Sequence, residues 1–203
     1  MSNTSKVLIT LTLAPALLYS QATLAVLLDA GPALAPDTRV ELEEELGALL
    51  AQAGVQVVVQ DIAPLNHLGA VSGLVNVHLQ GAGPVGVGRR GMPVSGSLGW
   101  VTQLDGVVQP FIHVDAAAVA THIGPLFLRG QEALARILLG RALARVVMHE
   151  LLHWLTQSAE HGEGLLFRPS VSPSTLIEDG IGLDAAEIWM VRWGLGLAED
   201  GVS

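Results

Sequence analysis

One group of side chains in the sequence has the composition and spacing of a metal site. His149, Glu150 and His153 form an H-E-x-x-H motif within the stretch from Gln131 to about Gln157, whose apolar residues recur with helical periodicity. Residues four apart lie on one face of a helix, so both histidines can direct an imidazole nitrogen at the same ion. Glu150 projects roughly 100° further round the axis, where a carboxylate can take a proton from water. The motif therefore predicts a metal site suited to hydrolysis.

The third ligand of that site has to come from outside the motif. A catalytic zinc ion takes three protein ligands and keeps one position open. We predict His161, because the helix is expected to end near Gln157, and Gly162 and Gly164 allow the chain to turn back towards the ion. Carboxylates are the alternatives: Glu160, Glu178 and Glu187. Two histidines bonded only to backbone carbonyls, with no metal, are the remaining explanation of the motif.

Four further side chains are candidates to assist a reaction at this site. His113, His122 and Arg168 could donate a hydrogen bond to an oxyanion. Arg145 lies one helical turn before His149, where it could support a ligand or form an ion pair. The acids considered as its partner lie in the C-terminal part of the chain: Asp179, Asp184 and Glu187.

The composition limits the partners and the chemistry. The chain has 203 residues, and 50% of them are hydrophobic, which suits one domain with a substantial core. Its formal net charge is -9 and its only adjacent basic pair is Arg89-Arg90, so we expect no nucleic-acid partner. The absence of cysteine excludes disulfides, thiol nucleophiles and cysteine-bound zinc.

Residues 1–22 are typical of a secretory signal peptide. Lys6 precedes the apolar run Val7–Leu18, and the small residues Ser20 and Ala22 fit a cleavage site. We therefore expect residues 23–203 to form a single secreted or periplasmic domain with no stable membrane insertion after cleavage. An uncleaved anchor over Val7–Leu28 and a first core strand are the alternatives. The oligomeric state does not follow from the sequence.

The first half of the chain alternates between predicted strands and a helix. Strands are expected at Thr23–Asp29, Val55–Asp61 and Val71–Leu79, and a helix at Asp37–Ala53 with Asp37 as its N-cap. Two strands joined through a helix form a β-α-β unit, in which the strands are parallel. The glycine-rich segment Gly81–Gly99 is expected to be a loop.

The second half is predicted to contain a hairpin, the long motif helix and a last helix. Asp105-Gly106 predicts a turn between the strands Leu98–Leu104 and Val107–Val114. Pro110 favours an edge position for the second strand, because proline cannot donate to the ladder. Such an edge could be an ordinary sheet border or could pair with an extended peptide. The last helix is expected from about Thr175 to Trp193, capped by Ser172 or Ser174 and interrupted near Gly180–Gly182.

The motif with its third histidine resembles the zincin metalloproteases, and the third histidine resembles the metzincin branch. Metzincin spacing would place Gly at 156 and His at 159, where this chain has Thr156 and Ala159, and Phe167 stands where a methionine turn is sought. Residues 140–176 and 98–115 more closely resemble a group of largely uncharacterised secreted bacterial proteins with H-E-x-x-H-x7-H. The resemblance implies an α+β, zincin-like fold. It consists of a mixed sheet with a backing helix, a long active-site helix and a small C-terminal helical part.

The resemblance also implies an activity. His149, His153 and His161 would hold Zn²⁺, with Glu150 as general base and then general acid, in a peptidase that acts on a peptide or protein. An endopeptidase is expected rather than an exopeptidase, and no particular substrate is implied. The alternative is a non-catalytic secreted zinc-site or partner-binding domain with the same fold.

Overall fold

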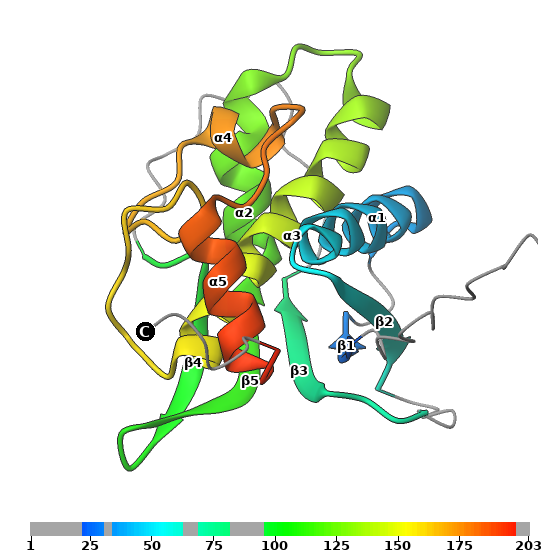
Figure 1. Cartoon of the computed structure of the whole chain (residues 1–203). Helices are drawn as coiled ribbons and strands as arrows, with labels where there is room; N and C mark the ends of the chain where they lie inside the picture. The colour runs from blue at the N-terminus through cyan, green and yellow to red at the C-terminus, as the bar shows by residue number, and fades with distance from the viewer. Residues whose placement is uncertain (1–21, 31–33, 63–68, 82–95, 198–203) are drawn as a thin grey trace, which may run out of the picture.

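The computed structural model describes residues 22–30, 34–62, 69–81 and 96–197 (Figure 1). The strands are β1 (Ala22–Asp29), β2 (Val55–Asp61), β3 (Gly73–Gln80), β4 (Gly99–Leu104) and β5 (Val107–Asp115). The helices are α1 (Pro36–Gln52), α2 (Ala116–Ile123), the 3-10 turn η1 (Gly124–Leu126), α3 (Glu132–Thr156), α4 (Pro173–Ile177) and α5 (Ala185–Gly194). The predicted signal peptide except Ala22, the Arg89-Arg90 pair and most of the predicted loop Gly81–Gly99 lie outside the described residues.

The five strands form one mixed sheet in the order β2-β1-β3-β5-β4. β1 pairs in parallel with β2 and β3, β3 pairs in parallel with β5, and β4 is antiparallel to β5. The predicted β-α-β unit and the predicted hairpin are therefore confirmed. The fold is α+β, as expected, with a mixed sheet and packed helices.

The core lies between one face of the sheet and the helices α1 and α3. Alternate residues of β3 and β5, among them Val77 and Ile112, are fully buried in the same apolar cluster as Leu46 and Leu143 of the two helices. In Figure 1, α3 crosses the molecule diagonally and α1 lies beside it. The intervening strand residues point to the opposite face of the sheet.

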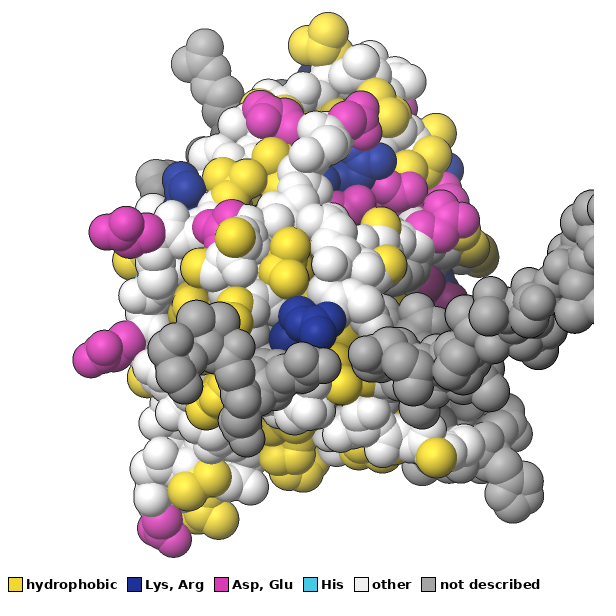
Figure 2. All heavy atoms as spheres, in the orientation of Figure 1, with side chains coloured by type: hydrophobic (Ala, Val, Ile, Leu, Met, Phe, Trp, Pro, Cys, Tyr) yellow, Lys and Arg dark blue, Asp and Glu magenta, His cyan; other side chains and the backbone are white. Residues whose placement is uncertain are grey.

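The surface agrees with the acidic composition. Acidic side chains are spread over the face shown in Figure 2, whereas Lys and Arg gather in only a few places. None of the helices within the described ranges has the length and apolar character that crossing a membrane requires.

Asp37 does not cap α1 as predicted. The helix begins at Pro36, and Ala35 occupies the N-cap position without a side-chain hydrogen bond. Proline is suited to the first turn of a helix because its missing N–H has no partner there anyway. Asp37 instead accepts hydrogen bonds from the Thr38 N–H at 2.9 Å and from Nε of Arg136 at 3.0 Å, which links α1 to α3.

The predicted edge position of the second hairpin strand is wrong. β5 pairs with β3 on one side and β4 on the other, and β4 is the edge strand. Pro110 is tolerated because pairing with β3 begins only at Phe111 and the β4 register shifts between Val101 and Gln103. Proline thus lies in an irregular part of the strand, where no regular ladder bond is lost.

The connection after β5 and the C-terminal part contain more helices than the sequence predicted. α2 and η1 were not predicted, and the Asp115 carboxylate caps α2 by accepting the Ala118 N–H at 2.8 Å. The last helix is two helices, α4 and α5, separated at the predicted interruption. Ser172 caps α4, as predicted. The long helix α3 matches the prediction within a residue at each end.

We expect Gly140→Ala to destabilise the fold because α1 and α3 are in backbone contact at this position. A Cβ on Gly140 would lie 2.3 Å from the carbonyl oxygen of Thr38 and 3.0 Å from the Leu42 nitrogen. The close contacts are with backbone atoms, so the clash should cost an amount near the upper end of about 1–3 kcal/mol and outweigh the roughly 1 kcal/mol gained from alanine's better helix propensity. Urea unfolding measures the change. Gly69→Ala is the control, because a Cβ there meets nothing within 4 Å; equal stability of both variants would contradict the prediction.

Candidate metal centre

The end of α3 positions the first two histidines and redirects the chain towards the third. Gln157 adopts the left-handed conformation with φ 53°, and the Ser158 N–H donates to the His153 carbonyl at 3.2 Å. The side-chain amide of Gln157 accepts the Val108 N–H at 3.2 Å and donates to the Val108 carbonyl at 3.0 Å. The helix therefore stops at a fixed point against β5, and the chain returns with His161 facing the motif.

The structure brings His149, His153 and His161 together as a group that could hold a metal ion. One ligand atom from each lies within 4.8 Å of the other two. The centroid of the His161 ring is 5.1 Å from that of His149 and 4.8 Å from that of His153. This is the ligand set predicted from the sequence, and it is the only such group in the described part of the chain.

Backbone carbonyls fix the tautomers of the two motif histidines. Nδ1 of His149 donates to the Leu166 carbonyl at 2.7 Å, and Nδ1 of His153 donates to the Ser158 carbonyl at 2.8 Å. A carbonyl can only accept, so both Nδ1 atoms carry the proton. Burial lowers the pKa of His149 to about 4 and also lowers that of His153, so both rings are neutral at neutral pH. Each Nε2 atom then carries no proton and has a free lone pair.

The two Nε2 atoms have the arrangement that a shared ion requires. They are 3.2 Å apart, and with both unprotonated no hydrogen bond can join them. Two nitrogens about 2.0–2.1 Å from one tetrahedral ion would be separated by about 3.3–3.4 Å. Neutral imidazoles are common ligands of Zn, Cu, Fe and Ni ions. The donor set thus fits a transition-metal cation, and the geometry does not identify which one.

The carboxylates weighed as the third ligand lie outside the histidine group. Glu160 and Glu178 are exposed. Glu187 is completely buried, and its carboxylate accepts hydrogen bonds from backbone N–H groups. Among the candidates, the structure brings only His161 to the two motif histidines.

Phe167 also contributes to the site. In the sequence it was noted only because it stands where a methionine turn would be sought. It is buried, and its ring centroid lies 4.8 Å from His153, 5.8 Å from His149 and 6.0 Å from His161. Its carbonyl accepts the N–H of Gly162 at 2.8 Å, directly after the third histidine. The apolar ring of Phe167 therefore packs near all three imidazole rings. No periodicity or motif in the sequence distinguishes it from an ordinary core residue.

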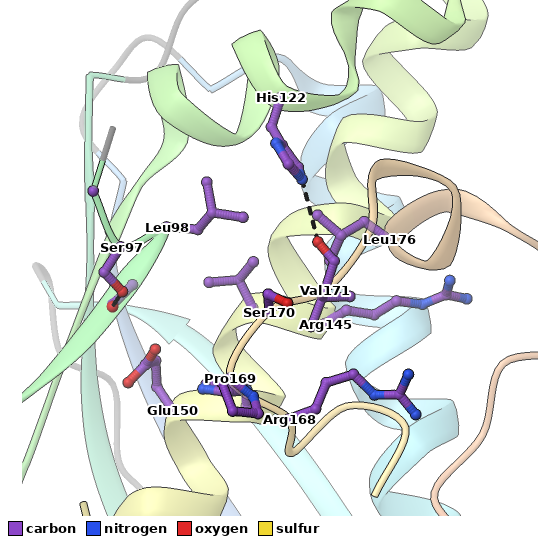
Figure 3. A pocket seen from close by; sticks show the side chains of 14 residues that line it. Ser97, Leu98, His122, Arg145, Glu150, Arg168, Pro169, Ser170, Val171 and Leu176 are labelled. Atoms are coloured by element: carbon purple, nitrogen blue, oxygen red, sulfur yellow. Dashed lines mark hydrogen bonds between the residues drawn. The ribbon is translucent and has the colours of Figure 1, made fainter. Parts of the chain in front are cut away.

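Glu150 lines a pocket of about 250 Å³ (Figure 3). Its side chain is buried, and burial raises its pKa to about 8. It packs against the edge strand at Gly99, where an added Cβ would lie 2.9 Å from Oε1. His149 and Glu150 both line the pocket, so a molecule bound there would reach both.

Residues from four parts of the chain form the walls of this pocket. They come from residues 96–99 at the start of β4, from α2, from α3, and from residues 168–176, which include part of α4. His122 lines the pocket, and its Nε2 donates to the Val171 carbonyl at 3.2 Å (Figure 3). Arg168 also lines it, and its Nε donates to the Gly164 carbonyl at 3.2 Å. Two of the three predicted oxyanion donors are therefore at the pocket, although each is hydrogen-bonded to a backbone carbonyl.

Arg145 lines the pocket but has a different ion-pair partner from those expected. Its Nε donates to Glu45 of α1 at 2.7 Å, and its Nη1 donates to the Thr175 carbonyl at 2.6 Å. Burial lowers the pKa of this guanidinium, and the pairing with Glu45 opposes that effect. The predicted pairing with a C-terminal acid was wrong because α1, distant in sequence, packs directly along α3. Arg145 links α1, α3 and α4.

His113 does not reach the pocket. It lies between the buried residues Ile112 and Val114, so it points to the face of the sheet opposite α3. There its ring stacks on Trp100 with centroids 5.2 Å apart, and its Nε2 lies 3.2 Å from the Thr102 hydroxyl. The alternation of side chains along β5 therefore separates His113 from the group formed by His149, His153 and His161.

Comparisons with protein-family models, with curated proteins and with solved structures gave no match. Function is therefore inferred from the geometry of the site.

Proposed function

We propose that this chain is a zinc-dependent peptidase with a zincin-like fold, in which His149, His153 and His161 hold the ion. The observation that carries the proposal is the pair of Nε2 atoms 3.2 Å apart, in two rings that are each held by a hydrogen bond from Nδ1 to a backbone carbonyl. Metal-binding histidines usually donate their second ring nitrogen to a carbonyl or carboxylate in this way. The mixed sheet with an antiparallel edge strand next to the motif helix supports the fold assignment.

The proposed reaction is hydrolysis, with Glu150 handling the proton. A zinc ion held by His149, His153 and His161 would supply Lewis-acid chemistry, which polarises a carbonyl group and makes water more acidic. A cation bound beside Glu150 would oppose the effect of burial and favour its ionised form, and the carboxylate would then take the proton from the attacking water and deliver it to the leaving amine. Its place in the pocket beside His149 supports this role, because a substrate bound there could contact both side chains.

The proposed substrate is an extended peptide or protein segment, cut internally. β4 is the edge of the described sheet, and Gly99 at its start lies directly against Glu150. An extended chain that hydrogen-bonds to such an edge passes the carboxylate, and its side chains alternate towards the pocket. The proposal includes secretion, which rests on the signal-like residues 1–22.

Zinc content and peptide cleavage by the purified protein test this proposal together. We expect one zinc per chain after dialysis and cleavage of a mixed peptide library within its sequences. A chelator should stop the cleavage, and added zinc should restore it. Absence of metal even after zinc is added would refute the metal site. Bound zinc without cleavage of any peptide would favour the non-catalytic domain instead.

A further inference from the structure

Glu187 is a buried carboxylate whose hydrogen bonds exceed what its helix requires. It is 0% exposed, and its Oε2 accepts the Asp184 N–H at 2.9 Å in the capping box of α5. In a capping box the glutamate accepts only this one hydrogen bond, from the backbone N–H of the N-cap residue. The other oxygen, Oε1, accepts the N–H groups of Leu166 and Phe167, each at 2.8 Å. No Lys or Arg pairs with Glu187 within the described residues, so backbone donors alone hold this carboxylate.

One of these donors belongs to the same peptide group that holds a metal ligand. The amide between Leu166 and Phe167 donates its N–H to Oε1 of Glu187 at 2.8 Å. The carbonyl of that amide accepts Nδ1–H of His149 at 2.7 Å. A continuous hydrogen-bond chain therefore runs from the carboxylate through a single peptide to the imidazole. Hydrogen bonds in such chains polarise and strengthen one another, and a charged acceptor at the end increases the effect.

The loop that carries these groups is built around the same carboxylate. A Cβ on Gly164 would lie 2.4 Å from Oε1 of Glu187, so only glycine allows the backbone to pass this closely. The loop closes where the Gly162 N–H meets the Phe167 carbonyl, one residue after His161. The N–H of Phe167 donates to Glu187, and the ring of Phe167 packs near the three imidazole rings. Removing the carboxylate would therefore affect the support of all three ligands.

We propose that Glu187 is the positioning residue of the metal centre and acts on His149 through the Leu166–Phe167 peptide. This inference rests on the proposed metal site. Glu187 does not touch the metal ligands, and its negative charge makes the Leu166 carbonyl a stronger acceptor. The imidazole of His149 is held more firmly in one tautomer and one orientation, and its Nε2 becomes the better donor to a cation.

The test compares metal affinity in Glu187→Gln and Asp184→Ala. Glutamine keeps the shape of the side chain and removes the charge, so we expect zinc to bind about 10- to 100-fold more weakly, as for loss of other outer-shell partners. Asp184→Ala removes the capping partner of the same helix and leaves both bonds to Oε1, so its zinc affinity should stay at the wild-type value. The absorption spectrum of bound cobalt(II) should change in the glutamine variant alone, because it reports ligand orientation rather than helix stability.

Equal zinc affinity of wild type and folded Glu187→Gln would overturn the inference and leave the metal site intact. Equal weakening by Asp184→Ala would also overturn it, because helix capping alone would then explain the effect. If wild type itself binds no zinc, the metal site and this inference both fail. If the glutamine variant does not fold, amide hydrogen exchange of the wild type tests the inference instead. The Phe167 N–H should be as protected from exchange as the N–H groups at the buried end of α3. Fast exchange of the Phe167 N–H would overturn the proposed hydrogen-bond chain from Glu187 to His149.

Discussion

Replacing Glu150 with glutamine should abolish hydrolysis while leaving the metal in place. Glutamine has the shape of the glutamate but cannot take a proton from water, and general acid–base catalysis typically contributes about 10²- to 10⁴-fold. Glu150 does not belong to the metal-ligand group, so the zinc content should equal that of the wild type. The measurement is kcat/KM on the best peptide from the library, beside elemental analysis of each protein.

The exposed Glu160 offers a matched control for this experiment. Glu160→Gln makes the same chemical change close to the third histidine and should leave kcat/KM and zinc content unchanged. Folding should not confuse the comparison, because the carboxylate of Glu150 has no hydrogen-bond partner in the described part of the chain. Full hydrolysis by Glu150→Gln would remove this residue from the reaction and with it the proposed mechanism.

Replacing His161 with alanine should remove most of the zinc affinity without unfolding the chain. The variant loses one of three ligands, so the affinity should fall by more than the roughly 10- to 100-fold that follows loss of an outer-shell partner. His161 is exposed, and its removal creates no cavity in the core. Competition with a coloured chelator measures the affinity, and added zinc should raise the melting temperature of the wild type but not of the variant.

His122→Ala is the comparison for the third-ligand experiment. His122 lines the pocket but does not belong to the ligand group, so its loss should leave zinc binding unchanged. If His161→Ala keeps the wild-type affinity, the third ligand is another side chain, and the three-histidine site is refuted.

The local parts of the site could be predicted from the sequence. Helical spacing places His149 and His153 on one face, and the return of His161 depends on a chain reversal within a few residues of the helix end. The strand prediction for Val55–Asp61 is confirmed residue for residue because its β-branched run has no competing pattern. These features depend on residues that are close together in the sequence, so sequence patterns can predict them.

The supporting parts of the site could not be predicted because they are tertiary contacts. Arg145 meets Glu45 only because α1 packs along α3, and the helix register gives no sign of that partner. Glu187 was weighed as a metal ligand, but its burial against the Leu166–Phe167 peptide depends on how α5 returns to the loop. The prediction of the edge strand was wrong for the same reason. Pro110 limits the hydrogen bonds of β5, but only the tertiary fold shows that β5 lies between β3 and β4.

All three metal ligands belong to one short stretch, from His149 to His161, and the sheet contributes none of them. An ion that joins such close neighbours closes only a small loop, and the entropy of loop closure grows with loop length. Metal binding at the proposed site would therefore constrain only the last turn of α3 and the segment after it, whereas the packing of α1 and α3 on the sheet forms without it. In small zinc-binding domains the ion is needed for folding itself. At the proposed site an ion would leave and return while the scaffold stays folded, so the zinc supply would govern the proposed activity without governing the amount of folded protein.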